Sequence, residues 1–374
     1  MQMKDLLDAL RQDLSETLSL LEAMVNLDSP SVDKGLVDKF VRFLGPKFEA
    51  IGGIVEYVSA ERFGDHLVAR FDGSPKGRLL ILGHTDTVFP AGEVVRRPFR
   101  VENDRATGPG VFDMKAGIAL IWAALRALGP LSRPVTVLLT SDEEVGSPSS
   151  RELIEKEAGK ASAVLVLEPS LPGGGLKTSR KGVGRFTVKA TGRAAHAGID
   201  PSRGINAIEE IAHQILQLQR MSDPARGTTV TVGLVQGGSR VNVVPAEAAV
   251  DLDVRITSND EAARITEAIR ALRPHLPGAT LHIRGGINRP PMDRTTDTAR
   301  LLEVARKVGE DLGIHIQEGS TGGASDGNFT AALGIPTLDG LGATGDGAHS
   351  LDEYVEISSM PERAALIAGL IRQI

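Results

Sequence analysis

Three continuous apolar runs, each followed at once by polar residues, constrain the fold of this chain more than any other feature. The runs occur in GRLLILGHTDTV, PVTVLLTSDEE and ASAVLVLEPS, and patterns typical of helices separate them. Apolar runs of this kind between helices are typical of parallel strands that are buried on both faces. We therefore predict an α/β domain with a mostly parallel central sheet flanked by helices. Its polar residues should lie at the carboxyl ends of the strands, where such sheets place ligands.

The middle of the chain has a different pattern. From about Val183 the order is strand, helix, two strands, helix and strand, which is the βαββαβ order of a ferredoxin-like α+β domain. A length of 374 residues also suggests two domains of ordinary size. We predict a first domain made of residues 1–178 and 288–374, with residues 179–287 inserted as a second domain.

Five segments supply the side chains of one chemical site, namely GHTDTV, GPGVFDMKAG, TSDEEVGS, LVLEPS and GDGAHS. The chain contains no cysteine, so any metal ion must be held by imidazole nitrogen and carboxylate oxygen. Two ions about 3.5–4 Å apart need one shared carboxylate and further ligands on each outer side. Taken singly, each acid would more often be a surface residue, but together they match the ligands of a two-metal hydrolase. The candidates are His84, Asp86, Asp113, Glu143, Glu144, Glu168 and His349.

Composition argues against several other classes. The formal net charge is -6 and aromatic residues make up 3%, so neither a basic face nor many stacking platforms are available for nucleic acid. The longest apolar stretches fall far short of a membrane span. Acidic residues interrupt the N-terminal Leu pattern, which indicates an amphipathic helix rather than an export signal, so the expected compartment is the cytoplasm.

Seven ordered motifs resemble one known family over nearly the whole chain. This is the co-catalytic zinc family that includes acetylornithine deacetylase, succinyl-diaminopimelate desuccinylase, aminoacylase and glutamate carboxypeptidase, and the folate-cleaving glutamate carboxypeptidases resemble this chain most. The motifs are GHTDTV at 83–88, GPGVFDMKAG at 108–117, TSDEEVGS at 140–147, LEPS at 167–170, GRAAHAG at 192–198, RVNVVPA at 240–246 and GAHS at 347–350.

The resemblance implies two zinc ions per chain, which cobalt or manganese could replace. His84 and Glu168 would bind one ion, Glu144 and His349 the other, and Asp113 would bridge both. The peptide bond between Asp113 and the following methionine would be cis.

Two further acids are implied to act without binding metal. Asp86 would orient the imidazole of His84. Glu143 would be the general base that takes a proton from zinc-bound water, so that hydroxide attacks the amide, and would pass the proton to the leaving amine.

The resemblance also implies substrate contacts and a homodimer through residues 179–287. His196 would reach the active site of a partner subunit and polarise the scissile carbonyl, Asn242 would serve the same cleft, and Arg289 would bind a substrate carboxylate. The folate-cleaving enzymes carry a substrate-binding lysine shortly after LEP, a place that Lys177, or Arg180 and Lys181, would take here. Gly323 belongs to a turn that is expected to face the substrate.

The predicted function is zinc-dependent hydrolysis of an amide in a small molecule or short peptide with a free carboxylate. Hydrolysis would release a C-terminal amino acid, and glutamate is the first candidate for it. The alternative is an N-acyl-amino-acid deacylase of the acetylornithine or succinyl-diaminopimelate type. A remote alternative is a relative that binds a ligand without catalysis, although no ligand is missing from the motifs.

Overall fold

A computed structural model describes residues 2–374, and the chain divides into two compact units. The first comprises Met1–Ser179, Arg294–Thr321 and Ser325–Ile374, and the second comprises Arg180–Asp293 and Gly322–Ala324. The chain returns to the first unit after Asp293, beyond the predicted boundary between residues 287 and 288. Strand β12 (Thr280–Arg289) continues past that boundary, and Met292 still pairs with Arg180.

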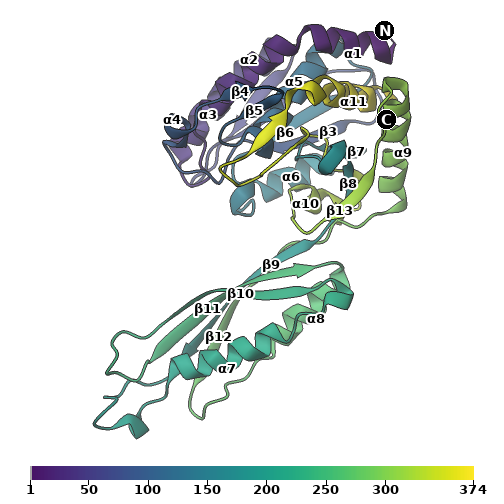
Figure 1. The fold of residues 1–374 in the computed structure, drawn as a ribbon. Coiled ribbons are helices and arrows are strands. Elements are labelled where there is room, and N and C mark those ends of the chain that lie inside the picture. The colour runs from purple at the N-terminus through teal and green to yellow at the C-terminus, as the bar shows by residue number, and fades with distance from the viewer. Residues whose placement is uncertain (1) are drawn as a thin grey trace. The chain divides into compact units, whose positions relative to one another are not determined.

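A six-stranded sheet forms the centre of the first unit (Figure 1), in the order β1-β2-β6-β3-β7-β14. Strands β6, β3, β7 and β14 are parallel to one another, and β2 and β1 extend the sheet in antiparallel fashion. The predicted mostly parallel sheet is therefore confirmed. The bounds are β1 Ile54–Val58, β2 His66–Phe71, β3 Leu79–His84, β6 Val135–Thr140, β7 Ala163–Val166 and β14 Thr337–Leu338.

Helices cover both faces of this sheet, as buried strands require. Along β3, Leu79 and Ile81 pack into one hydrophobic core, whereas Leu80 and Leu82 pack into another, because successive side chains point to opposite faces. The larger core includes helices α1 Met3–Gln12, α2 Leu14–Val25, α3 Lys34–Glu49, α5 Ala116–Leu128, α9 Thr296–Leu312 and α11 Met360–Gln373. The smaller core includes α6 Arg151–Ala158 and α10 Gly327–Ala332.

Shorter strands complete the first unit. One small sheet has the order β15-β16-β5-β4 and another pairs β13 with β8. The bounds are β4 Arg100–Glu102, β5 Arg105–Thr107, β8 Leu176–Arg180, β13 Glu318–Thr321, β15 Gly345–Asp346 and β16 Tyr354–Glu356, and the short helix α4 spans Glu93–Arg96. None of the helices described within residues 2–374 combines the length and apolar character needed to cross a membrane.

The second unit is an antiparallel four-stranded sheet with two helices on one face. Its order β10-β11-β9-β12, with helices after β9 and β11, confirms the predicted ferredoxin-like pattern. Val188, Val250 and Ile265 are among the buried residues of its own core. The bounds are β9 Gly182–Thr191, α7 Ala207–Gln219, β10 Thr229–Gly237, β11 Glu247–Ile256 and α8 Asn259–Arg270, followed by β12.

Glu261 ties helix α8 to the turn before β10, and this tie should depend on pH. Hydrogen bonds from Arg264, Thr228 and Arg226 lower the pKa of the Glu261 carboxyl to about 2. Stability gained from a lowered carboxyl pKa is present above the ordinary value and is lost as the pH falls through the folded-state value. We expect Glu261→Gln to lower the urea midpoint at pH 7, and the difference from wild type to shrink at pH 2. Glu267→Gln, an exposed change on the same helix, is the control; equal shifts in both variants would contradict the assignment.

Candidate metal centre

The ends of three neighbouring strands carry the predicted ligands. His84 is the last residue of β3, Glu143 and Glu144 begin the turn that follows β6, and Glu168 follows β7. Strands β6, β3 and β7 are adjacent and parallel, so their carboxyl ends bring these residues to one edge of the sheet. The strand pattern in the sequence predicted this convergence.

Asp113 lies between two imidazoles. Its Oδ1 is 3.1 Å from Nε2 of His84, and its Oδ2 is 3.3 Å from Nε2 of His349. Nε2 of His349 is also 3.1 Å from Oε2 of Glu144, and Nε2 of His84 is 3.7 Å from Oε1 of Glu168. The two oxygens of one carboxylate thus face different histidines, each of which has a further acid beside it.

These side chains fit a divalent metal ion. Ligand atoms of His84, Asp113 and Glu144 lie within 4.8 Å of one another, and so do ligand atoms of His84, Glu143 and Glu168. Imidazole nitrogen with carboxylate oxygen is a donor set that zinc accepts. We call these residues, together with His349, the histidine–carboxylate cluster. Glu143 and Glu144 are sequence neighbours, but Glu144 is grouped with Asp113 and Glu143 with Glu168, while His84 belongs to both groups.

The protonation preferences of the cluster favour positive charge between its acids. Burial would lower the pKa of His84, but hydrogen bonds to Asp113 and Asp86 outweigh it and raise this pKa well above its ordinary value. Hydrogen bonds to Asp113 and Glu144 raise the pKa of His349 to about 11. Burial raises the pKa of Glu144 to about 7, whereas the two histidines outweigh burial at Asp113 and hold its pKa far below the usual range. A bound cation would supply the positive charge that the imidazolium groups otherwise provide.

Asp86 contacts three members of the cluster: His84, Glu143 and Glu144. The Nδ1 atom of His84 lies 2.9 Å from the backbone oxygen of Asp86 and 3.5 Å from its carboxylate. An N–H donated from Nδ1 leaves Nε2 free to bind a cation. The Asp86 carboxylate accepts hydrogen bonds from the hydroxyl of Ser31 and from the backbone N–H groups of Glu143 and Glu144. It therefore fixes the turn after β6, and the backbone carbonyl is the nearer partner of the imidazole.

Two buried charged residues near Asp113 were not identified from the sequence. The carboxylate of Glu353 accepts hydrogen bonds from the backbone of the Asp113 loop, and the ammonium group of Lys115 donates to the carbonyl of Pro109 in the same loop. Burial raises the pKa of Glu353 to about 7 and lowers that of Lys115 to about 8. GAHSLDEYVEIS contains Glu353, but nothing in that segment indicates a contact with a loop 240 residues earlier. The predicted cis bond between Asp113 and Met114 is present.

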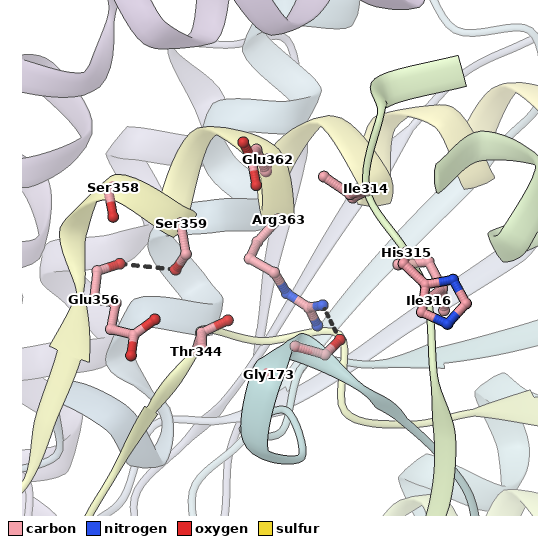
Figure 2. Close-up of a pocket in the computed structure, with 11 residues that line it drawn as sticks. Gly173, Ile314, His315, Ile316, Thr344, Glu356, Ser358, Ser359, Glu362 and Arg363 are labelled. Carbon is pink, nitrogen blue, oxygen red and sulfur yellow. Dashed lines mark hydrogen bonds between the residues drawn. The ribbon is translucent and has the colours of Figure 1, made fainter. Parts of the chain in front are cut away.

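A third residue that was not predicted, Arg363, holds the segment behind Glu168. It lines a hollow of about 370 Å³ in the first unit, between the start of α11 and the turn that contains Gly173 (Figure 2). Its guanidinium group donates to the backbone oxygens of Gly174, Gly340 and Gly342. The N–H of Gly342 in turn donates to the backbone oxygen of Glu168. No residue of the histidine–carboxylate cluster lines this hollow.

Most of the predicted substrate residues belong to the second unit. The loop of His196 pairs with that of Asn242: Ala197 donates its N–H to the backbone oxygen of Asn242, and His196 pairs with Val243. His196 is exposed, and its Nδ1 accepts hydrogen bonds from the backbone.

Other members of this predicted set already have partners within the protein. Nη1 of Arg180 donates to the backbone oxygen of Gly323, and Nζ of Lys181 donates to that of Gly227. Arg289 is buried at the end of β12, and Lys177 is buried in β8 of the first unit. Their roles toward a substrate stay predictions.

Histidines and carboxylates gathered at the strand ends of a parallel α/β sheet indicate a metal-dependent enzyme. The sequence model of Peptidase family M20/M25/M40 matches residues 80–373, and the chain belongs to this family of metal-dependent hydrolases.

Individual relatives agree with this membership. The chain is 33% identical to carboxypeptidase G2 of Pseudomonas sp. (strain RS-16), over 98% of this chain and 91% of that protein. It is 28% identical to an acetylornithine deacetylase of Pectobacterium carotovorum, over 97% and 98%. The fold is similar to that of an M20 family metallo-carboxypeptidase from Sulfolobus solfataricus, with a TM-score of 0.77, 18% identity, and coverage of 96% and 98%.

The support from Asp86 can be tested apart from catalysis. In Asp86→Asn, an amide NH2 group replaces one acceptor oxygen and faces the N–H donors of Glu143 and Glu144. We expect zinc affinity to fall about 10–100-fold, as is typical when a partner of a metal ligand is changed. Competition with a chelator measures this affinity, and Asp72→Asn, an exposed change, is the control. Unchanged zinc affinity in Asp86→Asn would exclude the supporting role.

Proposed function

We propose that this chain is a dizinc hydrolase that cleaves an amide and releases a C-terminal amino acid, with glutamate ranked first. The observation that carries the proposal is the position of Asp113, whose two carboxylate oxygens face His84 and His349. A shared carboxylate with separate outer ligands is what two neighbouring ions require. We assign His84 and Glu168 to one ion, and Glu144 and His349 to the other.

The chemistry follows from what each residue does around the scissile amide. Bound zinc would supply Lewis acidity, which lowers the pKa of a water and polarises the carbonyl. Glu143 takes the proton from the attacking water and delivers it to the nitrogen of the leaving amine. Its backbone N–H is fixed by the carboxylate of Asp86, and its carboxylate lies on the His84 and Glu168 side of the cluster.

The substrate assignment rests on residues of the second unit and on the relatives. Arg289 is proposed to bind the free carboxylate, because a planar guanidinium pairs with both carboxylate oxygens. The 33% identity to carboxypeptidase G2 supports a carboxypeptidase, and the 28% identity to acetylornithine deacetylase keeps an N-acyl-amino-acid deacylase as the second candidate.

We further propose a homodimer formed through the second unit. Strand β10 is an edge of its sheet and exposes Leu234, which is 60% accessible. Helix α7 exposes Leu216 to the same extent. An unpaired strand edge with exposed apolar side chains is suited to pairing with another chain. In the dimer, His196 and Asn242 would act in the active site of the partner subunit.

A substrate panel tests the catalytic proposal. Zinc-loaded protein is incubated with N-acyl-glutamates, folate, N-acetylornithine and N-succinyl-diaminopimelate, and the released amino acid is measured. We expect turnover of glutamate-terminal substrates that disappears in Glu143→Ala. Arg289→Gln should raise KM at least tenfold with a smaller change in kcat, whereas Arg284→Gln, an exposed change on the same strand, should not. Turnover of acetylornithine or the succinyl substrate alone would favour the second candidate.

Light scattering coupled to size-exclusion chromatography tests the dimer. Wild type should elute with twice the mass of the 39.6 kDa chain, and Leu234→Asp combined with Leu216→Asp should elute as the monomer. Val95→Asp places the same charge on an exposed apolar site of the first unit and serves as the control. A monomeric wild type, or a dimer that survives the double change, would contradict the proposed interface.

A further inference from the structure

The peptide group that joins Pro109 to Gly110 is held by opposite charges at its two ends. Its carbonyl oxygen accepts a hydrogen bond from Nζ of Lys115 at 3.2 Å. Its N–H donates to Oε2 of Glu353 at 3.1 Å. A cation at the carbonyl and an anion at the N–H both match the peptide dipole, so this peptide is fixed in one orientation.

Glu353 also holds the next part of the same loop. Its Oε1 accepts the N–H of Phe112 at 2.7 Å and the N–H of Asp113 at 3.0 Å. The Glu353 side chain therefore receives three backbone N–H groups from the loop that carries Asp113. A carboxylate that binds several N–H groups in this way fixes the course of the loop backbone.

Both charged groups are buried. Glu353 is 0% exposed and Lys115 is 1% exposed. Glu353 accepts the backbone N–H groups of Gly110, Phe112 and Asp113. Lys115 donates to the backbone oxygens of Leu27 and Pro109. Burying charge is unfavourable unless hydrogen bonds compensate, and here the compensating bonds go to backbone groups of the loop and its surroundings.

The loop has little freedom to move away from these contacts. Gly110 has a φ of 73°, a left-handed conformation that favours glycine. A Cβ atom at this position would lie 2.5 Å from Cγ2 of Thr87, which is three residues after His84. The loop thus packs closely against the segment that follows β3, and a larger residue at position 110 would displace it.

Glu353 also links two segments that supply ligands. Glu353 comes four residues after His349 and directly before β16. The N–H groups that donate to it belong to Asp113 and to the residues just before Asp113. His349 lies in a turn, has a φ of 65° and is half exposed. By contrast, His84 ends a strand that is paired on both sides, and Glu168 follows the neighbouring strand. The His349 side of the cluster is therefore the side that depends on Glu353.

We propose that Glu353 and Lys115 are a positioning pair that fixes Asp113 between the two histidines and selectively supports metal binding on the His349 side. The proposal rests on the dizinc function inferred above. Glu353 is the dominant member, because it contacts three N–H groups and connects two ligand segments. Lys115 contributes the matching contact at the carbonyl of Pro109.

Zinc retention in full-length Glu353→Gln tests this pair. The change keeps the shape of the side chain but removes its charge and turns an amide NH2 group toward N–H donors. After dialysis against a weak chelator, we expect two zinc ions per chain in wild type and one in Glu353→Gln, measured by metal analysis. The second ion should bind at least tenfold more weakly in chelator competition. The kcat should fall while KM stays near the wild-type value, because the substrate contacts are unchanged.

Matched variants separate positioning from a general loss of folding. Glu353→Asp keeps the charge and should partly rescue binding of the second ion. If Glu353→Gln does not fold, zinc retention is measured in Glu353→Asp instead, where the second ion should bind more weakly than in wild type. Lys115→Met should give a smaller loss than Glu353→Gln. Glu356→Gln, three residues after Glu353 and at the end of β16, should bind zinc like wild type. Thermal unfolding of each metal-free variant reports the effect on the fold itself.

The outcomes distinguish this inference from the function on which it rests. Wild-type retention of both ions in Glu353→Gln, or equal weakening of both ions, would overturn the selective positioning role. A single ion in wild type would instead reject the dizinc function. In that case the ratio of zinc affinities between Glu353→Gln and wild type still tests whether Glu353 positions Asp113, and a ratio near one would overturn it.

Discussion

The carboxylate of Asp113, which lies between two imidazoles and close to other acids, is the constraint on which the candidate metal centre depends. Carboxylate oxygens of Asp113 and Glu144 lie within 4.8 Å of each other, and so do those of Glu143 and Glu168. Carboxylates this close repel one another unless positive charge lies between them. In the structure His84 and His349 occupy that position, at 3.1 and 3.3 Å from the two oxygens of Asp113. A pair of divalent cations would meet the same requirement more fully, since each carries twice the charge of an imidazolium.

Two kinds of support hold this arrangement, and they differ in rigidity. His84 and Glu168 come from the ends of buried parallel strands, whose positions are fixed by pairing and by the cores on both faces. Asp113 and His349 come from loops, and buried polar contacts replace the strand ladder there. Asp86 fixes the turn of Glu143 and Glu144, Glu353 fixes the loop of Asp113, and Arg363 holds the segment beside Glu168. The loops are thus ordered by side chains distant in sequence.

The parts that could be predicted from the sequence are those in which a local pattern determines the structure. Continuous apolar runs predicted the buried strands, and because parallel strands end at one edge, the convergence of His84, Glu144 and Glu168 followed. The βαββαβ order predicted the second unit in the same way. Glu353 and Arg363 could not be predicted, because each acts through backbone groups more than 20 residues away and no local pattern indicates these partners. The nearer contact of the His84 ring to the Asp86 backbone, instead of its carboxylate, likewise depends on the geometry of the turn.

The location of metal in zinc-loaded crystals tests the central claim most directly. An anomalous difference map at the zinc absorption edge should show two peaks about 3.5–4 Å apart in each chain, with one Asp113 oxygen next to each peak. His84 and Glu168 should flank one peak, and Glu144 and His349 the other. A single peak, or two peaks that do not share Asp113, would contradict the account.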